Sequence, residues 1–139
     1  MASLVYNKCV QNAISGNINF AADTFKVMLV TSAYTPNKDT HQFRSDVTNE
    51  VTGTGYTAGG TASTCTVSLN TTSDYVEATF GNVSWGSATI TARACVIYKS
   101  RGGASSADEL VAYVDFGSDV ASTNATFAVT FSSALRFQN

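Results

Sequence analysis

The single histidine limits the chemistry that this sequence could support. His41 is the only histidine among 139 residues. A Ser-His-Asp triad would have to use it, and no serine lies in the Gly-x-Ser-x-Gly context of a nucleophile elbow. A zinc site built on several histidines is excluded for the same reason. We therefore interpret His41 as an ordinary loop residue.

Neighbouring carboxylates are the next candidates for acid–base chemistry. Asp74 lies three residues before Glu77, and Asp108 is followed directly by Glu109. Glycoside hydrolysis requires two carboxyl groups held across a cleft at a defined separation, which nearness in sequence does not establish. Residues 115–119 could offer oxygens to Ca²⁺ but lack the ligand density of a calcium loop, so we interpret them as a strand end followed by a turn.

A glycine-rich stretch superficially resembles a phosphate-binding loop. Four glycines fall within residues 53–60. A phosphate loop also needs a following helix and a lysine, and neither is indicated here. The glycines more simply allow the backbone to turn tightly or to pass close to another chain.

The three cysteines do not suggest a cross-link or a metal site. Cys9, Cys65 and Cys95 are odd in number and widely spaced, unlike a disulfide framework or a zinc-binding pattern. Free cysteine behaves as a small hydrophobic residue, so three reduced and mostly buried thiols are expected. The sequence thus predicts no catalytic residue, no cofactor and no metal, and a protein that is not an enzyme.

Composition excludes two classes of partner. Charged residues make up 13% of the chain, about half of the usual ~25%. The net charge is −2, and the lysines and arginines are scattered, so the electrostatic footprint of a nucleic-acid-binding protein or of a basic membrane-binding face is missing. No apolar run approaches the ~20 residues of a membrane span. The first residues lack a basic leader and an apolar signal core, so we expect folding in a cytoplasm.

The first segment has the pattern of a helix over residues 3–15. Ser3 is a plausible N-cap and Gly16 a plausible C-terminal stop. Apolar residues fall at helical spacing on one face: Tyr6, Cys9, Val10, Ala13 and Ile14. This helix either caps the core of its own domain or docks as an arm on a neighbour.

After the helix the hydrophobic period changes to two, which is typical of strands. Residues 25–30 are apolar on both faces, as are residues 89–98 and 110–116, and these fit central strands. Three further strands, at residues 64–69, 75–80 and 126–131, have one apolar and one threonine-rich face, and Leu135 and Phe137 suggest a short closing strand. With no alternating helices, the pattern predicts an all-β fold: a single antiparallel β-sandwich domain over residues 1–139, jelly-roll-like or immunoglobulin-like, with a short N-terminal helix.

Two segments depart from this regular pattern. Residues 32–51 form a long excursion that contains the only proline, Pro36, and in which residues 39–46 could form one short helix. A connection of this length in a compact domain is usually functional or packed by its own side chains. Residues 101–108 form a polar, glycine-containing loop.

Several stretches resemble a family of small structural proteins of tailed bacteriophages, over nearly the whole chain. They are Tyr6-Asn-Lys and residues 25–36 (FKVMLVTSAYTP), 46–60 (DVTNEVTGTGYTAGG), 89–99 (TITARACVIYK) and 110–119 (LVAYVDFGSD). The resemblance implies a virion structural protein, similar to jelly-roll-like head decoration or cement proteins. It implies no catalytic residues.

The first functional hypothesis is a capsid decoration protein. Such a protein would bind the lattice of the major capsid protein at the virion surface, after assembly in the host cytoplasm, and we expect a homo-oligomer, either a dimer or a trimer. The expected contact elements are the N-terminal helix, the excursion and the loop at 101–108. Aromatic residues and arginine are enriched at interface hot spots, which singles out Tyr34, Phe43, Arg44 and Arg101.

The alternative is a tail or tail-fibre module that binds a cell-surface glycan or another tail component. Trp85 and the tyrosines would then be stacking platforms, although a core position for Trp85 is favoured. Fibre proteins are usually elongated or repetitive, whereas this chain has no internal repeat. A carbohydrate-binding domain of a host cell is a third interpretation, and the missing leader disfavours it.

Overall fold

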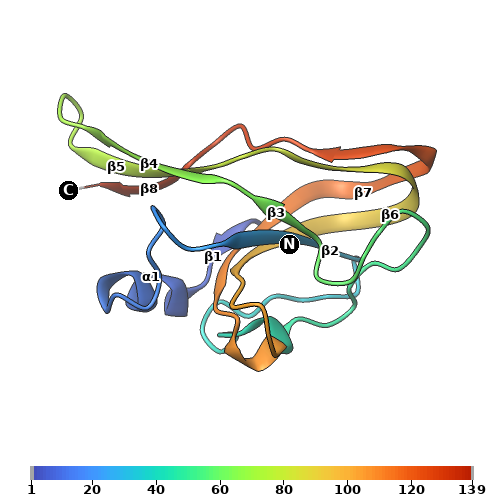
Figure 1. The fold of residues 1–139 in the computed structure, drawn as a ribbon, viewed down its shortest axis with the longest axis horizontal. Coiled ribbons are helices and arrows are strands. Elements are labelled where there is room, and N and C mark those ends of the chain that lie inside the picture. The colour runs from blue at the N-terminus through green and yellow to red at the C-terminus, as the bar shows by residue number, and fades with distance from the viewer. Residues whose placement is uncertain (1, 139) are drawn as a thin grey trace.

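The computed structural model describes residues 2–138 and contains two antiparallel β-sheets (Figure 1). The five-stranded sheet has the order β1 (Leu4–Val5), β7 (Leu110–Val129), β6 (Val83–Lys99), β2 (Phe25–Val30) and β3 (Thr61–Ser63). The three-stranded sheet consists of β4 (Cys65–Asn70), β5 (Tyr75–Phe80) and β8 (Leu135–Gln138). The helical elements are α1 (Asn7–Ile14) and two short 3₁₀ turns, η1 (Arg44–Asp46) and η2 (Ser105–Ala107). The predicted all-β sandwich with a short N-terminal helix is confirmed.

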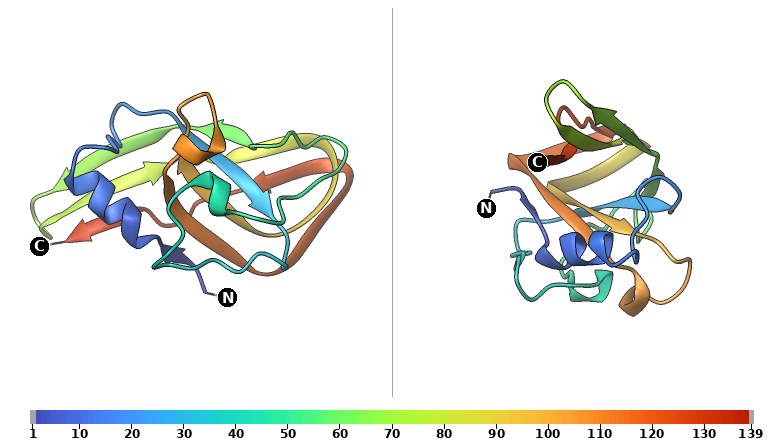
Figure 2. Two further views of the ribbon diagram at one scale, coloured as in Figure 1. Left: turned by 90° about the horizontal axis from the view of Figure 1, so that it is seen from below. Right: turned by 90° about the vertical axis from the view of Figure 1, so that its left-hand side faces the viewer.

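The long hairpin of β6 and β7 joins the two layers. Both strands turn over at one end of the molecule, from the layer of β4 and β5 into the layer of β2 (Figures 1 and 2). Their register shifts at several points, and at the largest shift Ala92 pairs with Val120 whereas Ala94 pairs with Asp115. Bulges of this kind bend strands so that they can pass between packed layers.

This bend corrects two sequence-based interpretations. The strands expected at residues 110–116 and 126–131 are the two halves of β7. Residues 115–119, interpreted as a strand end and a turn, lie inside that strand, where Gly117 has a φ of +86°. The pattern of alternation breaks there because the bulge places extra residues opposite Arg93, and local periodicity cannot distinguish such a bulge from a loop.

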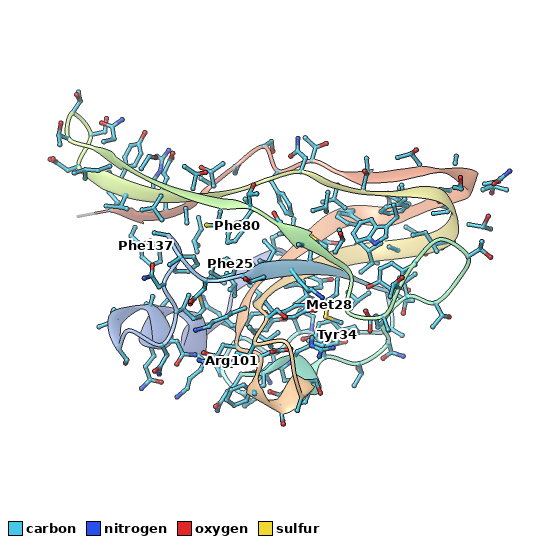
Figure 3. The ribbon with its side chains drawn as sticks, in the orientation of Figure 1. Phe25, Met28, Tyr34, Phe80, Arg101 and Phe137 are labelled. Carbon is cyan, nitrogen blue, oxygen red and sulfur yellow. The ribbon has the colours of Figure 1, made fainter. Side chains whose placement is uncertain are left out.

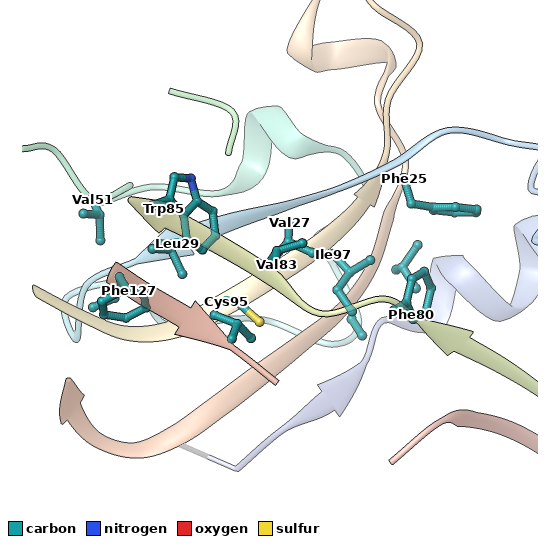
Figure 4. Close-up of a cluster of buried hydrophobic side chains, with 14 of the residues drawn as sticks. Phe25, Val27, Leu29, Val51, Phe80, Val83, Trp85, Cys95, Ile97 and Phe127 are labelled. Atoms are coloured by element: carbon teal, nitrogen blue, oxygen red, sulfur yellow. The ribbon is translucent and has the colours of Figure 1, made fainter. Parts of the chain in front are cut away.

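The main core lies between the layers. Trp85 and Phe127 from the bent parts of β6 and β7 pack over Val27 and Leu29 of β2, all at most 6% exposed (Figure 4). The rings of Phe25 and other phenylalanines continue this cluster towards β5. Burial of each such side chain contributes about 1.5–3 kcal/mol relative to exposure.

A second core lies on the opposite face of the five-stranded sheet. Met28 and Val30 of β2 point into it and are at most 2% exposed, which confirms that β2 is covered on both faces. Three tyrosines from different segments fill the space beneath them: Tyr6, Tyr34 and Tyr113. The cover consists of the N-terminal segment and the excursion, so these segments are integral to the fold.

The helix is shorter than predicted and turns a different face inward. Residues 4–5 pair with β7, so the helix begins at Asn7, and Ser3 accepts a hydrogen bond from the Asp115 N–H (2.8 Å) instead of capping it. Cys9 and Asn12 are its buried residues, whereas Val10 is 38% and Ile14 is 83% exposed. The predicted apolar face of residues 3–15 is therefore wrong in part, because strand pairing of the first residues fixes how the helix sits. The stop at Gly16 is confirmed, with a φ of +83°.

The glycine-rich stretch runs against the backbone of its own chain. A Cβ on Gly60, where φ is +75°, would lie 1.8 Å from the Val27 carbonyl oxygen, and one on Gly55 would lie 2.7 Å from the Ala88 Cα. Only glycine permits this close approach at a left-handed backbone position. The stretch therefore lines β2 and β6 of the same chain.

Tyr56 and Glu50 hold this stretch in place. The Tyr56 hydroxyl donates to Glu50 Oε2 (2.6 Å) and accepts from the Leu29 N–H (3.0 Å). The Gly59 N–H donates to the same carboxylate oxygen (2.7 Å), and the Tyr98 hydroxyl donates to the Gly59 carbonyl (2.5 Å). Burial raises the pKa of Tyr98 to about 12, so its hydroxyl keeps its proton as a donor.

Replacement of Gly60 by alanine tests this packing. We expect Gly60→Ala to lower the free energy of unfolding by at least about 3 kcal/mol, because the new Cβ meets the rigid backbone of β2. Urea unfolding followed by tryptophan fluorescence measures the loss. Gly103→Ala is the control, since a Cβ there meets no atom within 4 Å, and its effect should stay within about 0.5 kcal/mol. Equal effects of the two variants would contradict the packing account.

Candidate partner-binding face

The segments expected to contact a partner lie together on one side of the molecule. The excursion and the loop before β7 lie side by side below the five-stranded sheet, with α1 next to them (Figure 2). We call residues 31–50 and 100–109 together the loop layer. The Asn7 N–H donates to the Lys38 carbonyl (3.1 Å), and the Asn7 side chain donates to Asp39 (2.6 Å), which ties the start of α1 to this layer.

A buried aspartate joins the two halves of the loop layer. Asp108 is 1% exposed and accepts from Arg44 Nε (2.9 Å) and from the Arg101 N–H (2.8 Å). The Arg44 N–H donates to the Asp108 carbonyl (2.8 Å), and the Arg44 guanidinium lies 5.2 Å from the centre of the Tyr98 ring. Because each carboxylate oxygen of Asp108 has a donor, its burial is compensated.

The neighbouring glutamate fixes the second arginine. Glu109 is 4% exposed and accepts hydrogen bonds from both Nε (2.6 Å) and Nη2 (2.7 Å) of Arg101. This bidentate arrangement is the strongest geometry for an arginine–carboxylate pair. The Arg101 side chain remains 46% exposed, and Figure 3 shows it among the loops below the five-stranded sheet.

Phe43 and Asp46 form the turn that carries Arg44. Phe43 pairs as an isolated bridge with Glu109, and its N–H donates to Asp46 Oδ2 (2.9 Å), as does the N–H of Gln42 (2.8 Å). Burial acts to raise the pKa of Asp46, but these two donors outweigh it, and the pKa lies below its usual value. The short helix expected over residues 39–46 is wrong in extent, since only the 3₁₀ turn η1 forms.

Tyr34 lies beneath this face, in the second core. It is 3% exposed, stacks on His41 at 5.7 Å between ring centres and hydrogen-bonds to Tyr6 (2.9 Å) and to His41 Nδ1 (2.9 Å). The Asn37 N–H also donates to His41 Nδ1 (3.2 Å), so this nitrogen is an acceptor. The Tyr34 hydroxyl therefore donates to His41 Nδ1, and the Tyr6 hydroxyl donates to Tyr34. Tyr34 therefore anchors the excursion from below and offers no surface to a partner.

Three of the four residues selected from the sequence thus meet in one place. Phe43, Arg44 and Arg101 gather around Asp108 and Glu109, whereas Tyr34, although part of the same loop layer, is buried in the second core. Sequence reasoning noted Asp108 and Glu109 only as a pair of carboxylates and missed that they organise the face. Their position directly before an apolar strand was the available signal, because carboxylates there must find cations if they are buried.

The groups that could do chemistry are engaged in structural contacts. Asp108 and Glu109 face arginines, Glu77 faces Arg136 (2.6 Å), and His41 completes the tyrosine chain. Within residues 2–138, no group of three or more His, Cys, Asp or Glu side chains is placed to hold a metal ion. In that same part of the chain, no helix has the length and apolar character to cross a membrane.

The thiols are free, as predicted, and poorly reactive. Cys9 and Cys95 are buried and Cys65 is partly buried. Burial raises the pKa of Cys9 and of Cys95 to about 12 and that of Cys65 to about 11. Only the thiolate is nucleophilic, so at neutral pH these cysteines act as apolar side chains.

Trp85 is a core residue, as favoured from the sequence. It is 6% exposed and packs between Tyr56 (5.6 Å between ring centres) and Phe127 (6.2 Å). The glycan-binding alternative used this ring, together with the tyrosines, as stacking platforms. The position of Trp85 removes that platform from the surface.

No protein-family model, curated protein or solved structure matches the chain.

Replacement of the buried aspartate tests the organisation of the loop layer. Asp108→Asn leaves Arg44 without its charge partner, and we expect a loss of about 2–4 kcal/mol in the free energy of unfolding. Chemical unfolding measures it. Asp119→Asn changes the same functional group on an exposed residue and should shift stability by no more than about 0.5 kcal/mol. An unchanged stability in Asp108→Asn would show that the pair does not hold the layer.

The free energy of unfolding should also decrease in acid. The pKa of Asp46 is lowered by backbone donors and that of Asp115 by the Arg93 side chain, so both carboxylates stabilise the fold while ionised. A lowered folded-state pKa gives stabilisation that is present above the unfolded value of about 3.9 and is lost as the pH falls through the folded value. Unfolding free energies should be level near neutrality and decline below about pH 4. Asp46→Asn should reduce this decline, and an equally steep decline would contradict the assignment.

Proposed function

We propose that this protein is a non-enzymatic structural component of a bacteriophage virion, and specifically a capsid decoration protein. It would bind the outer surface of the major capsid protein lattice and stabilise the head. The proposal is supported by the resemblance of several stretches to small tailed-phage structural proteins and by the loop layer on one side of the sandwich.

The main support for the proposal is that ion pairs and hydrogen bonds hold the loop layer in one ordered arrangement. Irregular segments from distant parts of the chain are fixed by Asp108 and Glu109, each of which holds an arginine. A binding surface that is already rigid pays little conformational entropy when a partner docks. Its outward residues are small or polar, and the loop tip contains Gly102, Gly103 and Ala104, all exposed. Such a surface suits a broad, close and polar contact.

Decoration requires only modest affinity at each site. A protein that binds the assembled lattice but not its dissociated subunits stabilises the lattice by RT ln(1 + [L]/Kd) per site. Many identical sites on a symmetric shell add their contributions, so modest contacts give a large total resistance. No bond needs to be made or broken, which agrees with the structural use of the carboxylates, the histidine and the thiols.

Co-sedimentation with capsids tests this function. Purified protein is mixed with capsids that lack it, with tail fractions as a parallel sample. We expect saturable binding to capsids and a higher temperature of capsid disruption. Binding to tails alone would favour the tail-module alternative, and binding to neither would contradict a virion role in either place.

A bulky charge in the loop layer should abolish capsid binding without unfolding the protein. Gly103→Glu is suitable because Gly103 is exposed and a Cβ there meets no atom within 4 Å. Thr66→Glu is the matched control, since it adds the same side chain on an exposed residue of β4, outside the loop layer. We expect Gly103→Glu to lose at least about tenfold in affinity, as for a blocked interface centre, and Thr66→Glu to bind normally. The reverse result would place the contact elsewhere.

A further inference from the structure

The three-stranded sheet exposes an apolar face at one end of the molecule. The register places Leu69 opposite Val76 and Val76 opposite Phe137, and the next row contains Val67, Ala78 and Leu135. The opposite face of this sheet is polar and is closed by the Arg136–Glu77 pair. The apolar face should therefore be covered, yet Leu69 is 69% and Val67 is 42% exposed.

Exposed apolar side chains concentrate at this end. Five large hydrophobic residues in the described chain are exposed, and four of them belong to β4 or α1: Val67, Leu69, Val10 and Ile14. Val10 and Ile14 are four residues apart and share one side of the helix. Figures 1 and 2 show α1 and the β4–β5 hairpin at the same end of the molecule. We call these four residues, together with the hollow described next, the end patch.

A hollow of about 360 Å³ separates the three-stranded sheet from the chain that follows α1. Val76, Ala78 and Phe137 line it on one side, with Ile18 and Phe20 on the other, and Figure 3 shows Phe137 at this place. No charged residue lines it. The end patch thus combines protruding apolar side chains, with Ile14 83% exposed, and an apolar hollow that such side chains could fill.

We propose that the end patch is a two-fold interface with a second copy of this chain. In an isologous interface each copy offers the same patch, so the protrusions of one copy face the hollow of the other. Two residues of opposite charge at this end would likewise pair between the two copies. Asp74, at the turn between β4 and β5, makes no ion pair within residues 2–138, and neither does Lys8 of α1, which donates only to Gln11 (2.6 Å). Placing the hairpin of one copy over α1 of the other forms a Lys8–Asp74 pair twice.

A two-fold interface has to extend beyond the hollow, because a stable dimer buries about 800 Å² on each partner. The proposed interface therefore includes the β4–β5 hairpin and α1 as well as the hollow. The end patch is separate from the centre of the loop layer, so dimerisation goes beyond the proposed capsid contact and does not depend on it.

Sedimentation velocity of the purified protein, without capsids, tests the interface. We expect a concentration-dependent dimer within about 1–100 μM. Ile14→Ser and Leu69→Thr should each weaken it at least about tenfold, because each removes apolar burial twice per dimer. Val120→Ser is the matched control, since Val120 is 42% exposed but lies outside the patch, and it should leave the dimer unchanged. Circular dichroism confirms that each variant is folded.

Charge reversal separates this pairing from general stickiness. Lys8→Glu or Asp74→Lys alone should weaken the dimer several-fold, and the double variant should restore it, because the pair is re-formed with opposite signs. A monomer at all concentrations, a trimer, a dimer that Ile14→Ser and Leu69→Thr leave intact, or a double variant no better than the singles would overturn the proposal. The sedimentation experiment contains no capsids, so a failure of capsid binding would leave the dimer proposal unaffected.

Discussion

The antiparallel ladder between β6 and β7 is the constraint on which the rest of the structure depends. One hairpin supplies strands to both layers, because its bulges allow it to bend over at one end. Its inward residues, such as Trp85 and Phe127, build the main core, and its far end places Tyr98 and Leu110 in the second core. β2 then packs in a position that is buried on both sides. The loop layer is ordered because its inner side packs against the apolar side chains of this sheet in the second core.

The contribution of charge is concentrated where the second core meets the surface. Asp108 and Glu109 end the loop that leads into β7, and each pairs with an arginine instead of water. Buried ion pairs contribute little net stability compared with apolar contacts, but they penalise any other arrangement of their partners. Here they select one arrangement of two irregular segments. The result is one ordered polar face, which suits the proposed binding to a capsid lattice.

Sequence patterns predicted the parts of the fold that local alternation controls. The strands at residues 25–30 and 75–80 and the double burial of β2 follow from side chains whose environment repeats every two residues. The bend of β7 could not be predicted, since the extra residues opposite Arg93 look like a turn. The inward face of α1 was also missed, because pairing of residues 4–5 with β7, a contact distant in sequence, determines its orientation. Arg44 and Arg101 were selected as isolated hot-spot residues, and only the three-dimensional structure reveals the carboxylates that bring them together.

We propose that the loop layer is the surface that meets the capsid. Hydrogen–deuterium exchange of the free and the capsid-bound protein tests it directly, because exchange reports which backbone amides lose access to solvent. The account predicts slower exchange on binding for residues 37–46 and 101–107, with little change along the polar outer face of β4 and β5. Protection confined to the β4–β5 hairpin, or no protection in the loop layer of bound protein, would contradict it.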